Sequence, residues 1–579
     1  MSAPAASRST TRPVPAGTRC GLSLLSAAAG IGAGHLFGGL VSPSSAPVLA
    51  VADRVVGTVP TALTEFAIAT FGAADKIVLV AGVLAVLTAA ALVAGALSRR
   101  DERPGTAVLT VLGGIGVVAV ITGPAFGPLD LLAPAVSLIV ATWLWRRLYR
   151  LARRAARAAG PPATDPPGPA TDPPGPATDP TGLATDPPGP ATGSPADRSA
   201  ASPSATDRPP ATGRPAVTSR RRLLQASAAA GAGAVAAGAA GTALGAGISA
   251  AGGTTGSQAT VTARLAAARV RRAPALPAGA DLGLPGVTPF VTANPDFYRI
   301  DTALRVPSLR AEDWSLRVHG RVARELEISF DELMSRPLVE RRVTMTCVSN
   351  EVGGSLASTA LFVGVELRDL LLEAGPDVGA DQLLSTSTDG WTAGTPTGVV
   401  LEPGRGALLA VGMNGEALPR EHGFPVRMVV PGLYGYVSAT KWLADLELTT
   451  FAGRSSYWAD RGWGVLGPIK TGSRIDVPAA YGDVAAGRVV VAGTAWSQPR
   501  GISRVEVRVD DGPWVDAELG AADSGDAWRM WRAVVDMAPG GRNVVCRATD
   551  GDGRTQTAQE APVLPDGATG WPSRRVVAR

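Results

Sequence analysis

The sequence predicts a multi-domain chain in which transmembrane helices precede an α+β domain and a C-terminal β-sandwich. Hydrophobic residues make up 46% of the 579 residues and charged residues only 18%, a balance too apolar for a soluble protein. The apolar residues are concentrated before residue 250. Helix-like and strand-like patterns alternate over 285–470, and only strand patterns with regular turns follow from about 486 onward.

Four apolar stretches in residues 1–150 predict a membrane domain with four transmembrane helices. Each stretch is close to the roughly 20 residues that a membrane-spanning helix needs. Basic residues cluster before the first stretch, between the second and third, and after the fourth. By the positive-inside rule these clusters face the cytoplasm, and an even number of crossings satisfies all three. The stretches are 21–41, 77–97, 107–126 and 129–146.

Residues 151–220 are expected to form a cytoplasmic linker. The motif A-T-D-P-P-G-P recurs there, and proline at that density suits neither a helix nor a central strand. The next segment, 221–250, follows adjacent arginines and is a weakly apolar run of alanine and glycine. It is either an internal twin-arginine export signal or a fifth transmembrane helix with a basic flank. Both interpretations place the linker inside the cell and the chain after 250 outside it.

Local patterns predict the elements of the second half. Residues 366–374 carry leucines at helical spacing and stop at Gly375, which indicates a helix with a glycine cap. Residues 341–348 alternate apolar and polar side chains and predict a strand that ends near Cys347. Valines alternate over 505–509 before an Asp-Gly turn, as in the strands of a β-sandwich.

Two clusters of residues carry candidate chemistry. In the first, T-C-V-S-N-E-V-G-G at 346–354, the lone Cys347 ends a strand beside small and polar residues. A thiolate is a soft ligand suited to a metal centre, although a lone cysteine is also an ordinary core residue. The second cluster, 422–442, places one histidine, one arginine and one lysine among glycine and proline turns. This set suits a phosphate or anion pocket, and by itself it fits a surface loop equally well.

Together with N-P-D-F-Y-R-I-D at 294–301, these clusters resemble the molybdopterin-binding domain of the sulfite oxidase family. The resemblance covers 285–470, and 471–570 resembles that family's immunoglobulin-like dimerisation domain. Bacterial membrane-bound members, with transmembrane helices ahead of this module, are the most similar. The resemblance implies a molybdenum–molybdopterin cofactor, with Cys347 as the protein ligand to the metal and Arg299 as a catalytic residue near it. The residues that it assigns to the pterin and its phosphate are Asn294, Tyr298, Asn350, His422, Arg427, Ser438 and Lys441.

The same resemblance implies a multi-pass protein of the cell membrane whose catalytic domain lies outside the cytoplasm. An oxygen atom would be transferred to or from sulfite or a related sulfur or sulfoxide substrate. Electrons would pass to an external carrier, either a c-type cytochrome or a membrane haem protein, and the chain would form a homodimer. One departure concerns the substrate: Glu351 and Val352 stand where sulfite oxidases typically carry arginines. That exchange makes a poorer pocket for a dianion and leaves a neutral sulfoxide or an organic substrate open.

Other classes of protein suit the sequence less well. His35 is the only histidine in the apolar segments, so no haem is predicted, and the chain has no CxxC pair for zinc or an iron–sulfur cluster. The modest net charge of +5 lies mostly beside apolar segments, which argues against a nucleic-acid partner. A hydrolase would need a Gly-x-Ser-x-Gly turn, which the second half lacks. The main alternative is a non-catalytic membrane receptor or scaffold with a degenerate molybdopterin fold, but a scaffold has little reason to keep Cys347 and the anion-binding residues together.

Overall fold

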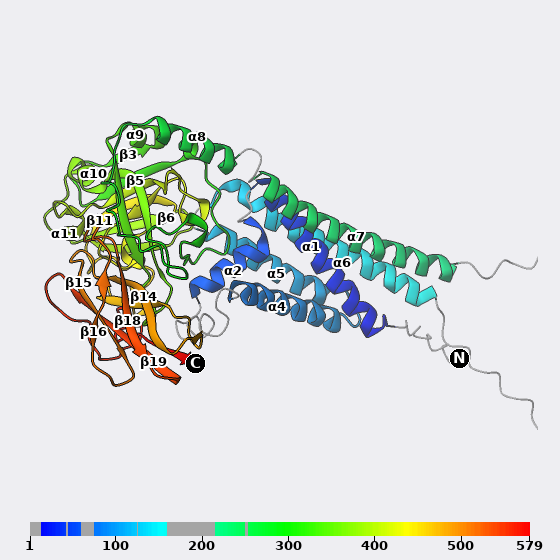
Figure 1. Cartoon of the computed structure of the whole chain (residues 1–579). Helices are drawn as coiled ribbons and strands as arrows, with labels where there is room; N and C mark the ends of the chain where they lie inside the picture. Colours follow the sequence, from blue (N-terminus) through cyan, green and yellow to red (C-terminus); the bar gives the residue numbers. More distant parts are fainter. Residues whose placement is uncertain (1–12, 42–44, 59–74, 124–125, 159–214, 249–252) are drawn as a thin grey trace, which may run out of the picture.

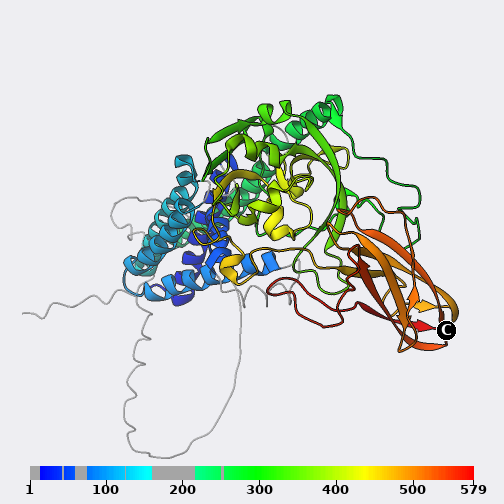
Figure 2. The same ribbon diagram turned by 90° about the vertical axis from the view of Figure 1, so that its left-hand side faces the viewer.

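The computed structural model describes residues 13–41, 45–58, 75–123, 126–158, 215–248 and 253–579. Most of the predicted linker therefore lies outside the described residues. In chain order, the described residues form a helical bundle, an α/β domain and a β-rich C-terminal region (Figure 1). The bundle extends away from the α/β domain, and the C-terminal region lies against another side of that domain (Figures 1 and 2).

Five helices of the described residues are long and apolar enough to cross a membrane, judged by length and composition. Four of them contain or overlap the predicted stretches, and the fifth covers most of 221–250, in line with the helical interpretation of that segment. A sixth, shorter helix, α2, was not predicted and lies at the end of the bundle nearest the α/β domain (Figure 1). The bundle helices are α1 (Ala16–Val41), α2 (Pro47–Thr58), α4 (Asp75–Leu97), α5 (Arg103–Ile121), α6 (Leu132–Ala158) and α7 (Pro215–Ile248).

Two boundaries of the bundle differ from the predicted ones. Helix α6 continues past residue 150 to Ala158, because the arginine- and alanine-rich sequence there consists of good helix formers. Helix α7 begins at Pro215, before the paired arginines. It packs closely on α1, since a Cβ added to Gly32 or Gly39 would collide with its backbone. Small residues permit this close approach of helices within a membrane.

The described residues of the predicted basic clusters lie at one end of the bundle. The Arg19 side chain at the start of α1 donates to Ala96 O (3.5 Å), and the Tyr149 hydroxyl of α6 donates to Ser98 O (2.8 Å). These bonds join the start of α1, the α4–α5 connection and the end of α6. In Figure 1 this end of the bundle faces away from the α/β domain.

The α/β domain is built on two sheets that share one hydrophobic core. Within 253–579, all of which is described, one sheet has the strand order β1-β4-β5-β8-β10 with β9 beside β8, and the other has the order β3-β2-β11-β6-β7. Buried side chains of both sheets form a single cluster. The strands are β1 (Val270–Arg271), β2 (Ser315–Gly320), β3 (Leu326–Ser329), β4 (Leu338–Thr346), β5 (Ala357–Glu366), β6 (Gln382–Ser387), β7 (Thr392–Pro396), β8 (Leu408–Met413), β9 (Glu416–Ala417), β10 (Arg427–Val429) and β11 (Leu443–Thr449).

Short helices cover and connect these sheets. The predicted helix at 366–374 is α10 (Leu367–Ala374), and Gly375 caps it in the left-handed conformation with φ 70°. The predicted strand at 341–348 is part of β4, which ends immediately before Cys347. The remaining helices of the domain are α8 (Thr254–Ala267), α9 (Phe330–Ser335), α11 (Thr397–Leu401) and α12 (Gly435–Ser438), with 3-10 turns η5 (Asn294–Asp296), η6 (Ala311–Asp313), η7 (Arg420–His422) and η8 (Ala459–Arg461).

The domain begins before the predicted boundary at 285. Helix α8 buries Val261 and Leu265 in the same core as the two sheets, and β1 pairs in parallel with β4. The composition around 254–267 is too close to that of the preceding alanine–glycine run to distinguish this helix by pattern alone. The tertiary contact therefore decides where the domain starts.

Two mostly antiparallel sheets with a common core form the C-terminal region. Their strand orders are β12-β14-β18-β17 and β13-β20-β19-β15-β16. Strand β20 pairs with β19 and β13, so the region extends beyond the predicted end at 570. Its strands are β12 (Gly472–Val477), β13 (Asp483–Val484), β14 (Gly487–Trp496), β15 (Ile502–Val509), β16 (Val515–Asp516), β17 (Glu518–Leu519), β18 (Arg529–Met537), β19 (Gly540–Asp550) and β20 (Ser573–Ala578).

The loop before β18 fastens the C-terminal region to β4. Thr344 N donates to Asp526 O (2.9 Å), and Trp528 N donates to the Thr344 hydroxyl (2.7 Å). Arg342 forms a nearly buried ion pair with Asp523 of the same loop. Because β4 leads directly to Cys347, this contact ties the two units together beside the predicted metal ligand.

Replacing Asp526 with asparagine is expected to stabilise the protein at neutral pH. Burial raises the pKa of Asp526 from 3.8 to about 6, against the opposing charges of Arg341 and Arg405. Because the pKa of Asp526 is higher in the folded than in the unfolded state, the free energy of unfolding falls by up to about 3 kcal/mol as the pH rises from 4 to 6. Asparagine avoids this loss. Urea unfolding followed by tryptophan fluorescence should therefore give Asp526→Asn a higher free energy of unfolding than the unaltered chain at pH 7.5 and an equal one at pH 4. Asp511→Asn, at an exposed turn, is the control, and equal pH dependence of all three proteins would contradict the prediction.

Candidate functional site

Cys347 directly follows the end of β4, a strand that lies between β1 and β5. Its backbone N donates to Leu356 O (3.0 Å), and its carbonyl accepts from Asn350 N (3.1 Å). The Asn350 side chain accepts from Leu356 N (2.8 Å), so the turn after the cysteine is fixed by its own hydrogen bonds. Cys347 as a whole residue is 9% exposed. Burial raises its pKa, and contacts with Ser349 and the charge of Lys441 oppose that rise.

Arg427, His422 and Lys441 gather around a tight turn at Gly423. This glycine has φ 107°, and a Cβ there would lie 3.0 Å from Lys441 Cα and 3.1 Å from Arg427 Cβ. Arg427 Nη1 donates to His422 O (3.1 Å). His422 Nε2 is 3.1 Å from Asn294 O, and since a carbonyl can only accept, Nε2 carries the proton. Burial lowers the pKa of His422 to about 4, so this imidazole is neutral at pH 7 with Nδ1 as an acceptor.

Arg427 is a buried cation without a counter-ion. Its side chain is 3% exposed, and Nη1 and Nη2 donate only to the carbonyls of His422 and Ala439. Nε has no hydrogen-bond partner, and none of the described carboxylates forms an ion pair with this arginine. Burial lowers its pKa to about 10. A buried charge in this position favours the binding of an anion.

Asp301 links two cations, Lys441 and Arg299, at the edge of the site. Lys441 Nζ lies 3.0 Å from Asp301 Oδ2, and Arg299 Nε lies 2.8 Å from the same oxygen. Lys441 also donates to Glu421 O (3.1 Å). Burial lowers the pKa of Lys441 to about 8, and Asp301 partly opposes this shift. Sequence reasoning missed Asp301, although it ends the motif at 294–301, because its two partners became visible only in the fold.

Asn294 and Tyr298 approach from the loop before β2. The Asn294 amide nitrogen donates to Glu416 Oε1 (2.6 Å), and its oxygen accepts from Asn414 (2.8 Å), so protein groups already occupy this side chain. Tyr298 stacks on Phe297 with the ring centroids 5.4 Å apart. Burial and the nearby Cys347 raise the pKa of the Tyr298 hydroxyl, which therefore remains protonated.

The structure places Ser438 and Asn350 differently from the other predicted residues. Ser438 lies in α12, and its hydroxyl donates within that turn to the carbonyls of Leu433 and Tyr434. Asn350 holds the cysteine turn. These two side chains shape the backbone of the site. Contacts connect five of the others in two groups: His422 joins Asn294 to Arg427, and Asp301 joins Arg299 to Lys441.

Comparisons with known proteins relate part of the chain to one family. Residues 303–458 match the oxidoreductase molybdopterin-binding domain, a range that includes Cys347, His422, Arg427 and Lys441. Sulfite oxidase of Gallus gallus is 31% identical over 324 residues, which cover 47% of this chain and 70% of that protein. Mitochondrial sulfite oxidase of Homo sapiens is 30% identical over 322 residues, covering 47% and 58%. This chain thus spans somewhat more than half the length of the mammalian relatives it matches. Among solved structures, the sulfane dehydrogenase SoxCD from Paracoccus pantotrophus aligns with a TM-score of 0.43 and 23% identity, over 51% of this chain and 82% of that chain.

Proposed function

Because this chain belongs to the sulfite oxidase family of molybdopterin-binding oxidoreductases, we propose that it is a membrane-anchored member that acts outside the cytoplasm. The proposed reaction is transfer of an oxygen atom to or from a small substrate, either sulfite or a related sulfur compound or sulfoxide. One observation carries the proposal: the buried Cys347 after β4 and the buried Arg427, which has no ion pair among the described residues, both interact electrostatically with the same buried side chain, Tyr298. A metal ligand and an anion site of this kind suit one cofactor that brings both a metal and a phosphate.

The side chains of the site fit the molybdenum–molybdopterin cofactor. A metal cation would reverse the raised pKa of the Cys347 thiol and bind the thiolate. An anionic phosphate would supply the counter-ion that Arg427 lacks, and Lys441 would add a second charge. The described residues contain no group of three or more histidine, cysteine, aspartate or glutamate side chains that could hold a metal, so Cys347 is the candidate single protein ligand.

The bound cofactor would supply oxygen-atom exchange and storage of two electrons, and the protein would supply orientation and charge. The neutral His422 offers Nδ1 as an acceptor for an N–H group of the pterin. Asn294 fixes this imidazole through its backbone carbonyl. Arg299, 41% exposed and held by Asp301, is the cation best placed to meet a substrate that arrives from solvent.

The bundle supports the proposed location. Five of the described helices could cross a membrane by length and composition, and the described residues of the basic clusters lie at the end remote from the α/β domain. By the positive-inside rule that end is cytoplasmic, which leaves the catalytic domain outside. We also propose that electrons pass to a separate c-type cytochrome or membrane haem protein. The C-terminal region would act as the family's immunoglobulin-like domain and hold a homodimer together.

Measurement of molybdenum and pterin in the purified full chain tests the proposal. Protein from a cofactor-competent host should contain near-stoichiometric molybdenum and show a Mo(V) paramagnetic resonance after partial reduction. The same chain from a host that cannot make the pterin is the control and should contain neither. Well-folded protein that remains free of molybdenum and pterin in the competent host would point instead to the scaffold alternative.

A further inference from the structure

A cavity of about 430 Å³ lies between the α/β domain and the C-terminal region. The turn after Cys347 forms one wall, and the segments 468–473 and 550–557 form others. Of the residues assigned above to the cofactor, only Asn350 lines it. Its volume falls within the range of roughly 300–1,000 Å³ that is usual for small-molecule sites. The cavity is therefore large enough for a ligand of its own, separate from the pterin.

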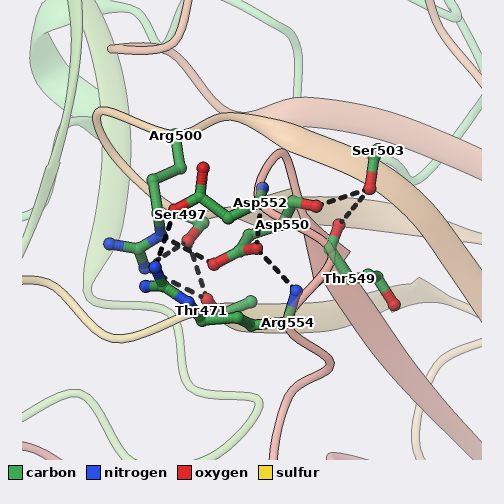
Figure 3. Close-up of polar contacts among 8 residues, drawn as sticks. All are labelled: Thr471, Ser497, Arg500, Ser503, Thr549, Asp550, Asp552 and Arg554. Carbon is green, nitrogen blue, oxygen red and sulfur yellow. Dashed lines mark hydrogen bonds and ion pairs between the residues drawn. The ribbon is translucent and has the colours of Figure 1, made fainter.

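Arg500 lines this cavity, and hydrogen bonds hold its guanidinium in place (Figure 3). Its Nε donates to Asp550 Oδ2 (2.6 Å), and its Nη2 donates to the Ser497 hydroxyl (2.7 Å). Asp550 is fully buried, and its other oxygen accepts backbone N–H groups from Asp552 and Arg554. The carboxylate is thus saturated and serves to orient Arg500. In the described part of the chain, Arg500 Nη1 has no hydrogen-bond partner and remains available to a ligand.

Two further cations line the same cavity. Arg554, 70% exposed, has a single ion pair, with Asp552 at 3.0 Å. Exposed pairs of this kind hold a side chain only weakly, so Arg554 is free to turn toward a bound anion. Lys470 is anchored to Asp566 (2.7 Å). Glu351 and Asp550 are the acidic residues of the lining, and each of the three cations already has a carboxylate partner. An anion would therefore be held by the free donors of Arg500 and Arg554 and not by an excess of positive charge.

Thr346 gives an independent sign of a missing partner. It is the last residue of β4, is 2% exposed and lines the cavity, yet its hydroxyl has no hydrogen-bond partner. A buried polar group without a partner is rare and costly. Apolar side chains, among them Trp496 and Ile469, complete the lining. The wall thus combines polar donors with a surface suited to an organic body.

We propose that this cavity binds a small organic carboxylate. Arg500 Nη1 donates to the carboxylate, Arg554 closes over it, and the Thr346 hydroxyl offers the ligand a further hydrogen bond. The space exceeds that of an inorganic ion, and the apolar wall receives the carbon skeleton. Because the site adjoins the turn after Cys347, the ligand would contact the backbone that carries the metal ligand. The site stands independently of the cofactor assignment.

Calorimetric titration of the full chain with benzoate tests this site, with neutral benzamide as the isosteric comparison. Benzoate should bind at millimolar concentration or below, more weakly at high salt, and benzamide should not. Arg554→Gln should weaken benzoate binding about tenfold or more, the effect of losing a hydrogen bond to a charged group. Because Arg554 is exposed, its replacement does not endanger the fold. Thr346→Val should also weaken binding.

Arg504→Gln is the matched control, since this exposed arginine of β15 pairs with Asp516 and lies outside the cavity lining. It should bind benzoate as the unaltered chain does. Three results would overturn the proposal: no benzoate binding, equal binding of benzamide, or unchanged affinity in Arg554→Gln. Titration of cofactor-free protein separates the two proposals, because benzoate should bind there whether or not the chain ever takes up molybdenum.

Discussion

Replacing Cys347 with serine is expected to leave most of the pterin bound and to reduce oxygen-atom transfer by more than about 100-fold, since even outer-shell partners of a metal are worth 10–100-fold. The hydroxyl is a harder and less acidic ligand than the thiol and does not replace a thiolate at neutral pH. The pterin would remain because its proposed phosphate contacts, Arg427 and Lys441, are untouched. Fluorescence of the released pterin and the Mo(V) resonance, measured on the same preparation, check both halves of this expectation.

Cys546→Ser is the matched control for this substitution. Cys546 is a second buried cysteine, but it lies in β19, where its thiol donates to the Ser473 hydroxyl (3.4 Å). A serine there retains a donor, so the cofactor and its resonance should stay as in the unaltered chain. An identical Mo(V) resonance in Cys347→Ser would remove this cysteine from the metal centre. Loss of pterin together with the metal would instead show that the cysteine is needed for cofactor retention.

The features that depend on local pattern were predictable from the sequence. The strand leading to Cys347 is visible in the alternation of its side chains, and the glycine that caps α10 follows a helical leucine pattern. The five candidate membrane helices follow from the length of their apolar runs. In each case the property is carried by a few neighbouring residues, so no knowledge of the tertiary structure was required.

The features that depend on distant partners were not predictable in the same way. The motif that contributes Asn294 is recognisable, but only the fold shows that its amide is already bonded to Glu416 and that its carbonyl orients His422. Asp301 joins Arg299 to Lys441 across a long stretch of chain. No local pattern distinguishes such a carboxylate from one on a solvated surface.

The same reasoning applies to the departure at Glu351 and Val352. The sequence showed that arginines are missing after the cysteine motif, and it suggested a poorer site for an anion. The fold shows that Glu351 and Val352 line a cavity to which the C-terminal region contributes Arg500 and Arg554. Positive charge is therefore present near this turn but comes from a part of the chain more than a hundred residues away. Whether a ligand there is substrate or effector is decided by the response of the metal centre to it.

Replacing Arg427 with methionine is expected to lower cofactor binding by at least about 30-fold, because truncating one partner of a buried charge pair costs roughly 2–5 kcal/mol. The cofactor-free protein should change little. Burial depresses the Arg427 pKa from 12.5 to about 10, which corresponds to roughly 3 kcal/mol against the charged side chain at every pH below 10. Methionine removes that cost but also removes two hydrogen bonds to carbonyls, each worth about 1 kcal/mol. The two effects nearly cancel.

The test of this prediction therefore uses the protein from a cofactor-competent host and the cofactor-free protein. Pterin content should collapse in Arg427→Met, while thermal unfolding of cofactor-free protein should match the unaltered chain. Arg427→Lys is the matched control, because it keeps the charge but loses the planar fork. Its pterin content should lie between those of the unaltered chain and Arg427→Met. If Arg427→Met kept its pterin, the buried arginine would have no role in holding the phosphate. If the cofactor-free variant unfolded, the arginine would be a structural residue whose carbonyl contacts outweigh its buried charge. The expected pattern, loss of cofactor without loss of fold, is the one that a site built for an anion should give.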